Sequence, residues 1–156
     1  MFFNLLLIFS FAMVQGNRPP QTFDRATFYK AIAANNKEQI DAQLSLVTTT
    51  SLAEKEAYEG TLLMKKAGMA AKAKEKLSLF KAGRQQLENA ISKNNTNTEY
   101  RFLRLIIQEH APKVVKYRNK LEEDSQDIRT NFKSLSPTLQ QIILDYNKKS
   151  TILKIL

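Results

Sequence analysis

The apolar residues of this chain recur at helical spacing along almost its whole length, and this pattern limits the possible folds more than any other feature. No stretch alternates apolar and polar residues as a half-buried strand does, and no dipeptide typical of a β-hairpin is present. Apolar residues make up 43% of the chain, enough for a hydrophobic core and too many for a disordered protein. The sequence therefore predicts an all-α protein.

Caps, turns and prolines divide the chain into about seven helices. The expected ranges are 23–35, 37–47, 52–67, 71–93, 99–110, 113–134 and a last helix that begins after Ser136-Pro137. Ser51 begins a capping-box pattern, Gly68 can end the third helix, and Pro112 closes the fifth. Because the connections are short, consecutive helices should be antiparallel neighbours within a single domain over residues 17–156.

Residues 1–16 differ from the rest of the chain because they carry no charged side chain. The segment from Leu5 to Val14 is apolar apart from Ser10, and it has the length of a signal-peptide core rather than of a membrane span. We therefore expect a signal peptide that is cleaved after Gly16, and no transmembrane span after its removal. The expected location is periplasmic or secreted, and the alternative for this segment is a buried N-terminal helix.

Two segments carry the pattern of helical repeats. Residues 28–44 resemble the paired helices of a solenoid unit, and residues 83–103 resemble the second helix of a tetratricopeptide repeat that runs into the next repeat. In the second segment Leu87 and Ala90 match the apolar and small positions, whereas Asn94 stands where the repeat has a proline. The resemblance implies a tetratricopeptide-like helical array, and the alternative is an irregular bundle.

A second resemblance is carried by YEGTLLM at residues 58–64 and EYRFLRLIIQE at residues 99–109. Both segments are similar to uncharacterised small exported helical proteins found in Bacteroidetes genomes. This resemblance implies a periplasmic location and no particular activity.

The residue types that most enzymes need are scarce. The chain has no Cys, one His and four Gly, which excludes thiolate metal sites, cysteine nucleophiles and most histidine-based zinc or iron sites. It contains no glycine-rich nucleotide-binding motif, and no pairing of residues suggests a serine nucleophile. We therefore predict a protein without catalytic residues, resident metal or cofactor.

The segment 99–110 is the most unusual, because it is apolar on most sides and is therefore expected to be the central helix. Arg101, Arg104 and Gln108 share one narrow polar stripe on it. Buried guanidiniums need partners, and Glu59 and Asp124 are the acidic candidates on neighbouring helices. These residues form either a cleft that binds a carboxylate or phosphate, or a structural network of ion pairs.

The net charge of +9 arises from 24 basic and 15 acidic side chains, and the excess grows toward the C-terminal end. On the expected helix 113–134, Lys113, Lys116 and Lys120 are spaced to form one basic face. In an exported protein this charge suits anionic polysaccharide, lipid headgroups or an acidic partner, whereas the export signal and the lack of a recognition motif argue against nucleic acid. Alternatively, the charge only keeps the protein soluble.

Two functions are compatible with these observations. The first is a non-catalytic interaction module, periplasmic or secreted, in which a groove or apolar surface holds a peptide or a partner protein. The second is an electrostatic binder of anionic cell-envelope material, polysaccharide or lipid headgroups, through the basic face and the lysine-rich residues 65–76. An enzyme is the least supported alternative.

Overall fold

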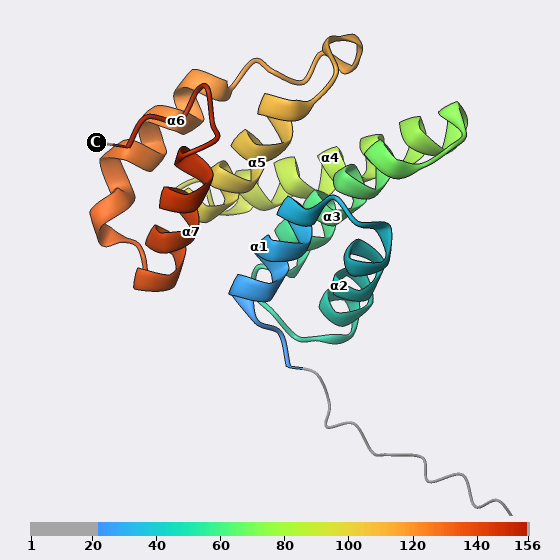
Figure 1. The fold of residues 1–156 in the computed structure, drawn as a ribbon, viewed down its shortest axis with the longest axis horizontal. Coiled ribbons are helices and arrows are strands. Elements are labelled where there is room, and N and C mark those ends of the chain that lie inside the picture. Colours follow the sequence, from blue (N-terminus) through green and yellow to red (C-terminus); the bar gives the residue numbers. More distant parts are fainter. Residues whose placement is uncertain (1–21, 156) are drawn as a thin grey trace, which may run out of the picture.

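The computed structural model describes residues 22–155, so the expected signal peptide over residues 1–16 lies outside it. The described chain contains seven α-helices, two 3-10 turns and no strand, which confirms the all-α class (Figure 1). The elements are α1 (Arg25–Ala34), α2 (Lys37–Thr49), α3 (Lys55–Met69), α4 (Ala73–Lys93), α5 (Thr98–His110), η1 (Lys113–Val115), α6 (Leu121–Asn131), η2 (Phe132–Ser134) and α7 (Pro137–Asn147). No helix among residues 22–155 combines the length and the apolar character that crossing a membrane requires.

Side-chain caps explain where several helices begin. Asp24 accepts a hydrogen bond from the backbone N–H of Thr27 at 2.8 Å, and Asn36 accepts one from Gln39 at 2.9 Å. Asn97, rather than Thr98, caps α5 through the N–H of Glu99 and Tyr100. Ser136 caps α7, which has Pro137 in its first turn as expected.

Two predicted features around α3 are wrong. The expected capping box at Ser51 does not form, and α3 begins at Lys55 after a turn closed by the Lys55 N–H on the Leu52 carbonyl. Gly68 does not end the helix, because it does not adopt the left-handed conformation that a C-terminal glycine supplies. The backbone N–H of Ala70 instead bonds the carbonyls of Lys66 and Ala67, and α3 continues to Met69.

The end of α2 also differs from the prediction, which ended this helix at residue 47. Thr48 and Thr49 belong to α2. Their hydroxyls donate to the carbonyls of Leu44 and Ser45, one turn back, at 2.9 and 3.0 Å. Back-bonding of this kind lets a β-branched threonine remain in a helix.

The expected continuous helix 113–134 is wrong. Lys116 takes a left-handed conformation at φ 47° and ends the short turn η1, and α6 begins only at Leu121. The helix is interrupted at Tyr117, which is buried at 1% exposure. The centre of its ring lies 4.6 Å from the Arg84 guanidinium, and its hydroxyl donates a hydrogen bond to Glu88. Val114, which the expected helix would include, is 84% exposed.

Helix α5 lies at the centre of the molecule, with the α3–α4 pair on one side and α6 and α7 on the other (Figure 1). Every residue from Thr98 to Glu109 except Arg101 is buried, which confirms the expected central helix. Phe102, Leu103 and Leu105 are completely inaccessible to solvent. A helix that is apolar on nearly all sides can bury its surface only where other helices surround it.

Helices α3 and α4 run in opposite directions and approach each other unusually closely at Gly60 and Gly83 (Figure 1). A Cβ atom added to Gly60 would lie 2.6 Å from the Gly83 carbonyl oxygen and 2.8 Å from the Leu87 nitrogen. These neighbours are backbone atoms that cannot rotate away. The two glycines therefore set the distance between the helices that carry Glu88 and Lys65.

The remaining elements close the fold. The segment 28–44 forms the helix pair α1–α2, with its turn at Asn35 and Asn36. Helix α1 also contacts α7, and after α7 the tail returns to the core, where Leu153 is completely buried. A tetratricopeptide-like array and an irregular bundle both stay predictions for the finer architecture.

Candidate functional site

The predicted polar stripe of α5 is enclosed by carboxylates. Arg104, 4% exposed, donates from Nε and Nη2 to the two carboxylate oxygens of Asp124 at 2.7 and 2.6 Å. Its Nη1 donates to Glu88 of α4 at 2.9 Å. Burial raises the pKa of the Asp124 carboxyl, and the two guanidiniums beside it oppose the rise. This bidentate pair joins α5 to α6 and α4.

Arg101 belongs to the same network. Its Nη1 donates to Glu123 at 3.1 Å and to Asp124 at 3.3 Å, and its Nη2 donates to the Asn95 carbonyl at 3.0 Å. Neither arginine lines the hollows described below. The structure therefore favours the ion-pair interpretation of Arg101, Arg104 and Asp124 over an open binding cleft.

Glu59 and Gln108 have other positions than the sequence suggested. Glu59 makes no hydrogen bond or ion pair with Arg101 or Arg104 within residues 22–155, and Glu88 of α4 is the third carboxylate instead. The prediction for Glu59 is therefore wrong. Gln108 is completely buried, and its Oε1 accepts the backbone N–H of Lys120 at 3.1 Å, which holds the start of α6 against α5.

The expected basic face of Lys113, Lys116 and Lys120 does not exist as one helix face. Lys113 and Lys116 lie in and after η1, whereas Lys120 precedes α6. Lys120 is also paired, since its Nζ lies 2.6 Å from Glu123. The prediction fails because it assumed a continuous helix through Tyr117.

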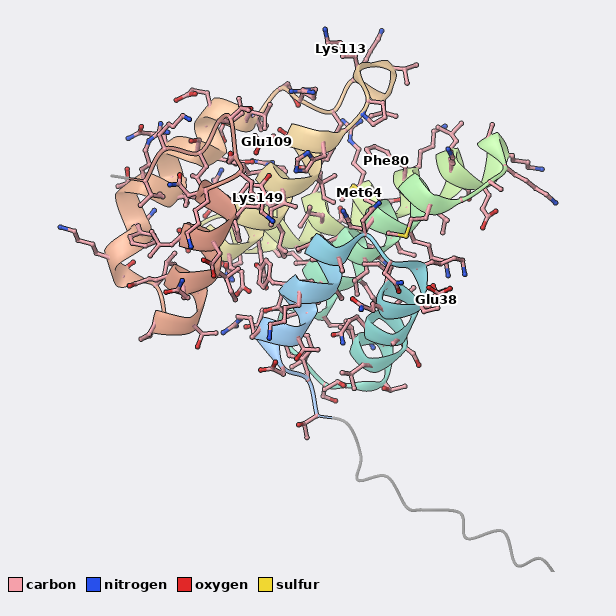
Figure 2. All side chains as sticks on the ribbon, in the orientation of Figure 1. Glu38, Met64, Phe80, Glu109, Lys113 and Lys149 are labelled. Atoms are coloured by element: carbon pink, nitrogen blue, oxygen red, sulfur yellow. The ribbon has the colours of Figure 1, made fainter. Side chains whose placement is uncertain are left out.

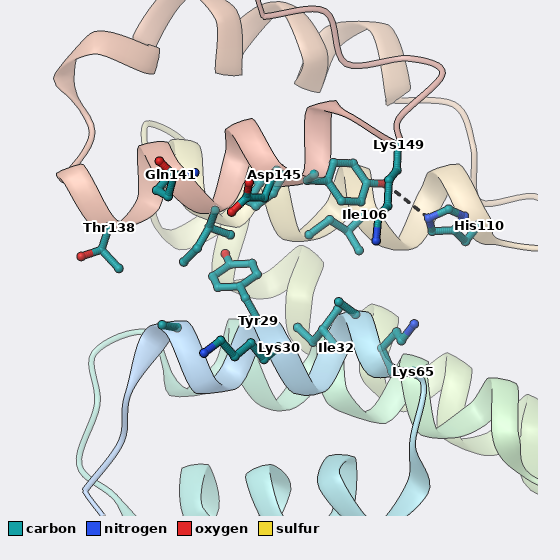
Figure 3. A pocket seen from close by; sticks show the side chains of 15 residues that line it. Tyr29, Lys30, Ile32, Lys65, Ile106, His110, Thr138, Gln141, Asp145 and Lys149 are labelled. Atoms are coloured by element: carbon teal, nitrogen blue, oxygen red, sulfur yellow. Dashed lines mark hydrogen bonds between the residues drawn. The ribbon is translucent and has the colours of Figure 1, made fainter.

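A groove of about 580 Å³ lies between α1 and α7, with α5 as its floor (Figure 3). We call it the α1–α7 groove. Phe102 and Ile106 form the floor, Tyr29 and Ile32 belong to the α1 wall, and Ile142 to the α7 wall. This volume lies within the range of about 300–1,000 Å³ that is typical of ligand sites.

Three aromatic rings connect the floor to both walls. The Phe102 ring of α5 lies 5.5 Å from Tyr29 of α1 in a stacked arrangement. It also lies 5.5 Å from Tyr146 of α7 in an edge-to-face arrangement. Such pairs stabilise a contact beyond the area that they bury. The groove thus has a rigid aromatic centre.

Basic side chains border the groove without matching acids. Lys30 lies on the α1 wall, and Lys65 and Lys149 flank the end at which His110 lies (Figure 3). None of these lysines forms an ion pair with a carboxylate among residues 22–155. The acid in the lining, Asp145, is paired with Lys148 at 2.7 Å. Lys65 is half-buried, and this burial lowers the pKa of its ammonium.

The α7 wall is fixed to α5 by Glu109. Its carboxylate accepts hydrogen bonds from the Tyr146 hydroxyl at 2.7 Å, the Ser150 hydroxyl at 2.8 Å and the backbone N–H of Thr151 at 2.6 Å. Burial alone would raise the pKa of Glu109, but these hydrogen bonds hold it below the ordinary value. The Tyr146 hydroxyl also lies 3.4 Å from Nε2 of His110.

The α1 wall is fixed by a second buried carboxylate of α5. Glu99 accepts hydrogen bonds from the hydroxyls of Tyr29 and Tyr58 at 3.2 and 3.0 Å, and its Oε1 lies 3.0 Å from Nε of Arg25. Burial raises the pKa of Glu99, against the effect of Arg25 and of the hydrogen bonds from Tyr58 and Tyr29. The two ends of α5 therefore hold the two walls of the groove.

The sequence did not predict this groove. Its lining includes Ile32 of α1 and Ile142 and Tyr146 of α7, which lie far apart in the sequence. Nothing in a single sequence indicates that two faces more than a hundred residues apart lie opposite each other. The unpaired lysines could not be recognised either, because pairing depends on that same tertiary arrangement.

A scan against protein-family models, a search of curated proteins and a search of solved structures each find no match to this chain.

Proposed function

We propose that this protein is a non-catalytic helical interaction module of the periplasm or the cell exterior, and that it binds an apolar, acidic segment of a partner polypeptide in the α1–α7 groove. One observation carries this proposal. An apolar, aromatic floor is bordered by Lys30, Lys65 and Lys149, and none of them has a carboxylate partner among the described residues. By contrast, the arginines beside α5, Arg25, Arg101 and Arg104, are each paired with a carboxylate.

The chemistry of the lining defines the partner. Phe102, Ile106 and Ile142 can contact apolar side chains, and burying such side chains drives association. The lysines lie at separate places along the groove, so several acidic groups match them better than a single anionic headgroup (Figure 3). Thr138 and Gln141 add side chains that can hydrogen-bond a peptide backbone.

The test selects short random peptides displayed on phage against the full chain. We expect the enriched peptides to combine aliphatic or aromatic residues with Asp or Glu. Their binding to Ala33→Trp, a change that fills the groove at an exposed lining position, should fall at least tenfold. The matched control is Ala82→Trp, which places the same side chain at an exposed position of α4 outside the groove.

Three outcomes contradict the proposal. Enriched peptides that bind Ala33→Trp as well as the wild type would locate their site elsewhere. A selection without enrichment would exclude a peptide partner of this chemistry. Binding of dodecanoate, lost in Ala33→Trp while no peptide binds, would make the groove a site for a small amphiphile instead.

A further inference from the structure

A second surface combines exposed apolar side chains with unpaired lysines. It consists of the start of α4 (residues 72–77) and the η1 turn (residues 113–116), and we call it the basic tip. Both parts border one hollow of about 410 Å³, which Leu77 and Phe80 line from α4 and Val115 lines from η1. The start of α4 and the η1 loop both extend away from the body of the molecule, toward the top and right of the view (Figure 1). Lys113 lies at the projecting end of the η1 loop (Figure 2).

The tip exposes apolar side chains that the fold does not use. Val114 is 84% exposed and Leu77 is 50% exposed, and they are two of the three large exposed hydrophobic residues of the described chain. Val114 is presented at the end of a tight turn, which the left-handed conformation of Lys116 terminates. Val114 therefore contributes nothing to the core, and its apolar surface is available for a contact outside the molecule.

The charge of the tip is strongly one-sided. Its ten residues contain Lys72, Lys74, Lys76, Lys113 and Lys116, with Glu75 as the single acid. Within the described chain none of these lysines is in an ion pair, and all are exposed. Elsewhere on the surface, lysines such as Lys93 and Lys66 have carboxylate partners at 2.7 and 2.6 Å. The tip therefore presents an uncompensated positive field around two apolar side chains.

From this arrangement we propose that the basic tip docks on the surface of an anionic lipid bilayer. The lysine ammoniums contact phosphate headgroups, while Val114 and Leu77 enter the boundary between headgroups and acyl chains. A polysaccharide or nucleic acid would match the lysines but leave both apolar side chains in water, and this favours a lipid surface. The tip does not depend on the α1–α7 groove, so either proposal can fail without the other.

Because the chain has no cysteine, a single Val114→Cys can be labelled with an environment-sensitive fluorophore in the full protein. We expect its emission to shift to the blue with vesicles of phosphatidylcholine and phosphatidylglycerol, and not with pure phosphatidylcholine. The control is the same label at Ser134→Cys, an exposed position in η2 away from the tip. The label reports on the tip alone, so binding through another segment does not shift it.

Charge variants complete the experiment. Lys113→Gln combined with Lys116→Gln should lower vesicle partitioning roughly twentyfold at low salt, with a smaller effect as salt rises. The pair Lys133→Gln and Lys154→Gln removes the same charge from exposed positions outside the tip and should change partitioning little. The proposal is wrong if the label does not shift, if it shifts equally on neutral vesicles or at residue 134, or if a soluble polyanion binds the tip and vesicles do not.

Discussion

On one side of α5 the guanidiniums of Arg101 and Arg104 are enclosed by carboxylates, whereas on the other side Lys30 and Lys65 border an apolar groove without an acidic partner among the described residues. The two sides belong to one helix, which with its side chains is about 10–12 Å across. The first side holds α5 to its neighbours, because both guanidiniums are paired with carboxylates of α4 and α6. The second has the composition of a binding site, in which apolar surface and positive charge are left for a partner.

This difference shows which charges hold the fold and which do not. Breaking a buried ion pair by removing one member is strongly destabilising, because the other charge stays buried and unmatched. Removing an exposed lysine without a partner costs little stability. Mutations on the two sides should therefore separate stability from binding.

The largest effect is expected for Asp124→Ala. This change leaves Arg104, 4% exposed, and Arg101 without their shared carboxylate, and we expect the free energy of unfolding to fall by about 3–5 kcal/mol. Urea unfolding followed by circular dichroism measures the change. The control is Glu122→Ala, which removes an acid of the same helix whose side chain is 83% exposed and should cost at most about 1 kcal/mol. If Asp124→Ala lowered the free energy of unfolding no more than the control, the network would not be what holds α5 to α6 and α4.

A smaller effect is expected for Glu109→Gln, which weakens the attachment of the α7 wall. Several hydrogen bonds to one buried carboxylate are affected, and we expect a loss of about 1.5–3 kcal/mol at pH 7. The folded pKa of Glu109 lies below its ordinary value of 4.5, so its contribution is complete above that pH and is lost as the pH falls through the folded pKa.

The difference in unfolding free energy between wild type and Glu109→Gln should therefore shrink between pH 7 and pH 3. Glu122→Gln, at an exposed position, serves as the control and should show a much smaller dependence. A difference that is constant or grows on acidification would contradict the assigned role of the Glu109 carboxylate.

The smallest effect on stability is expected for the groove lysines. Lys30→Gln and Lys149→Gln change exposed side chains without ion pairs, so the free energy of unfolding should stay within about 0.5 kcal/mol of the wild-type value. Binding of peptides selected on the groove should weaken in both variants, while Lys133→Gln leaves it unchanged. A large loss of stability would show that these lysines help to hold the fold.

The secondary structure was largely predictable, because signals such as Ser136 followed by Pro137 act within one turn of the chain. The central position of α5 was predictable as well, since its sequence is apolar on most sides. The break at Lys116 was not, because it depends on Tyr117 contacting Arg84 and Glu88 of a different helix. For the same reason the partners of Arg104 were only half predictable: Asp124 was identified, whereas Glu88 of α4 replaced Glu59 of α3.

The attachment of the α7 wall through Glu109 has a consequence for the order of assembly. The groove needs α1, the first described helix, and α7 with the Ser150–Thr151 turn, near the last described residue. During synthesis, the α1–α7 groove therefore forms only after α7 and the Ser150–Thr151 turn have been made. A product shortened before residue 137 would lack the α7 wall and have no α1–α7 groove.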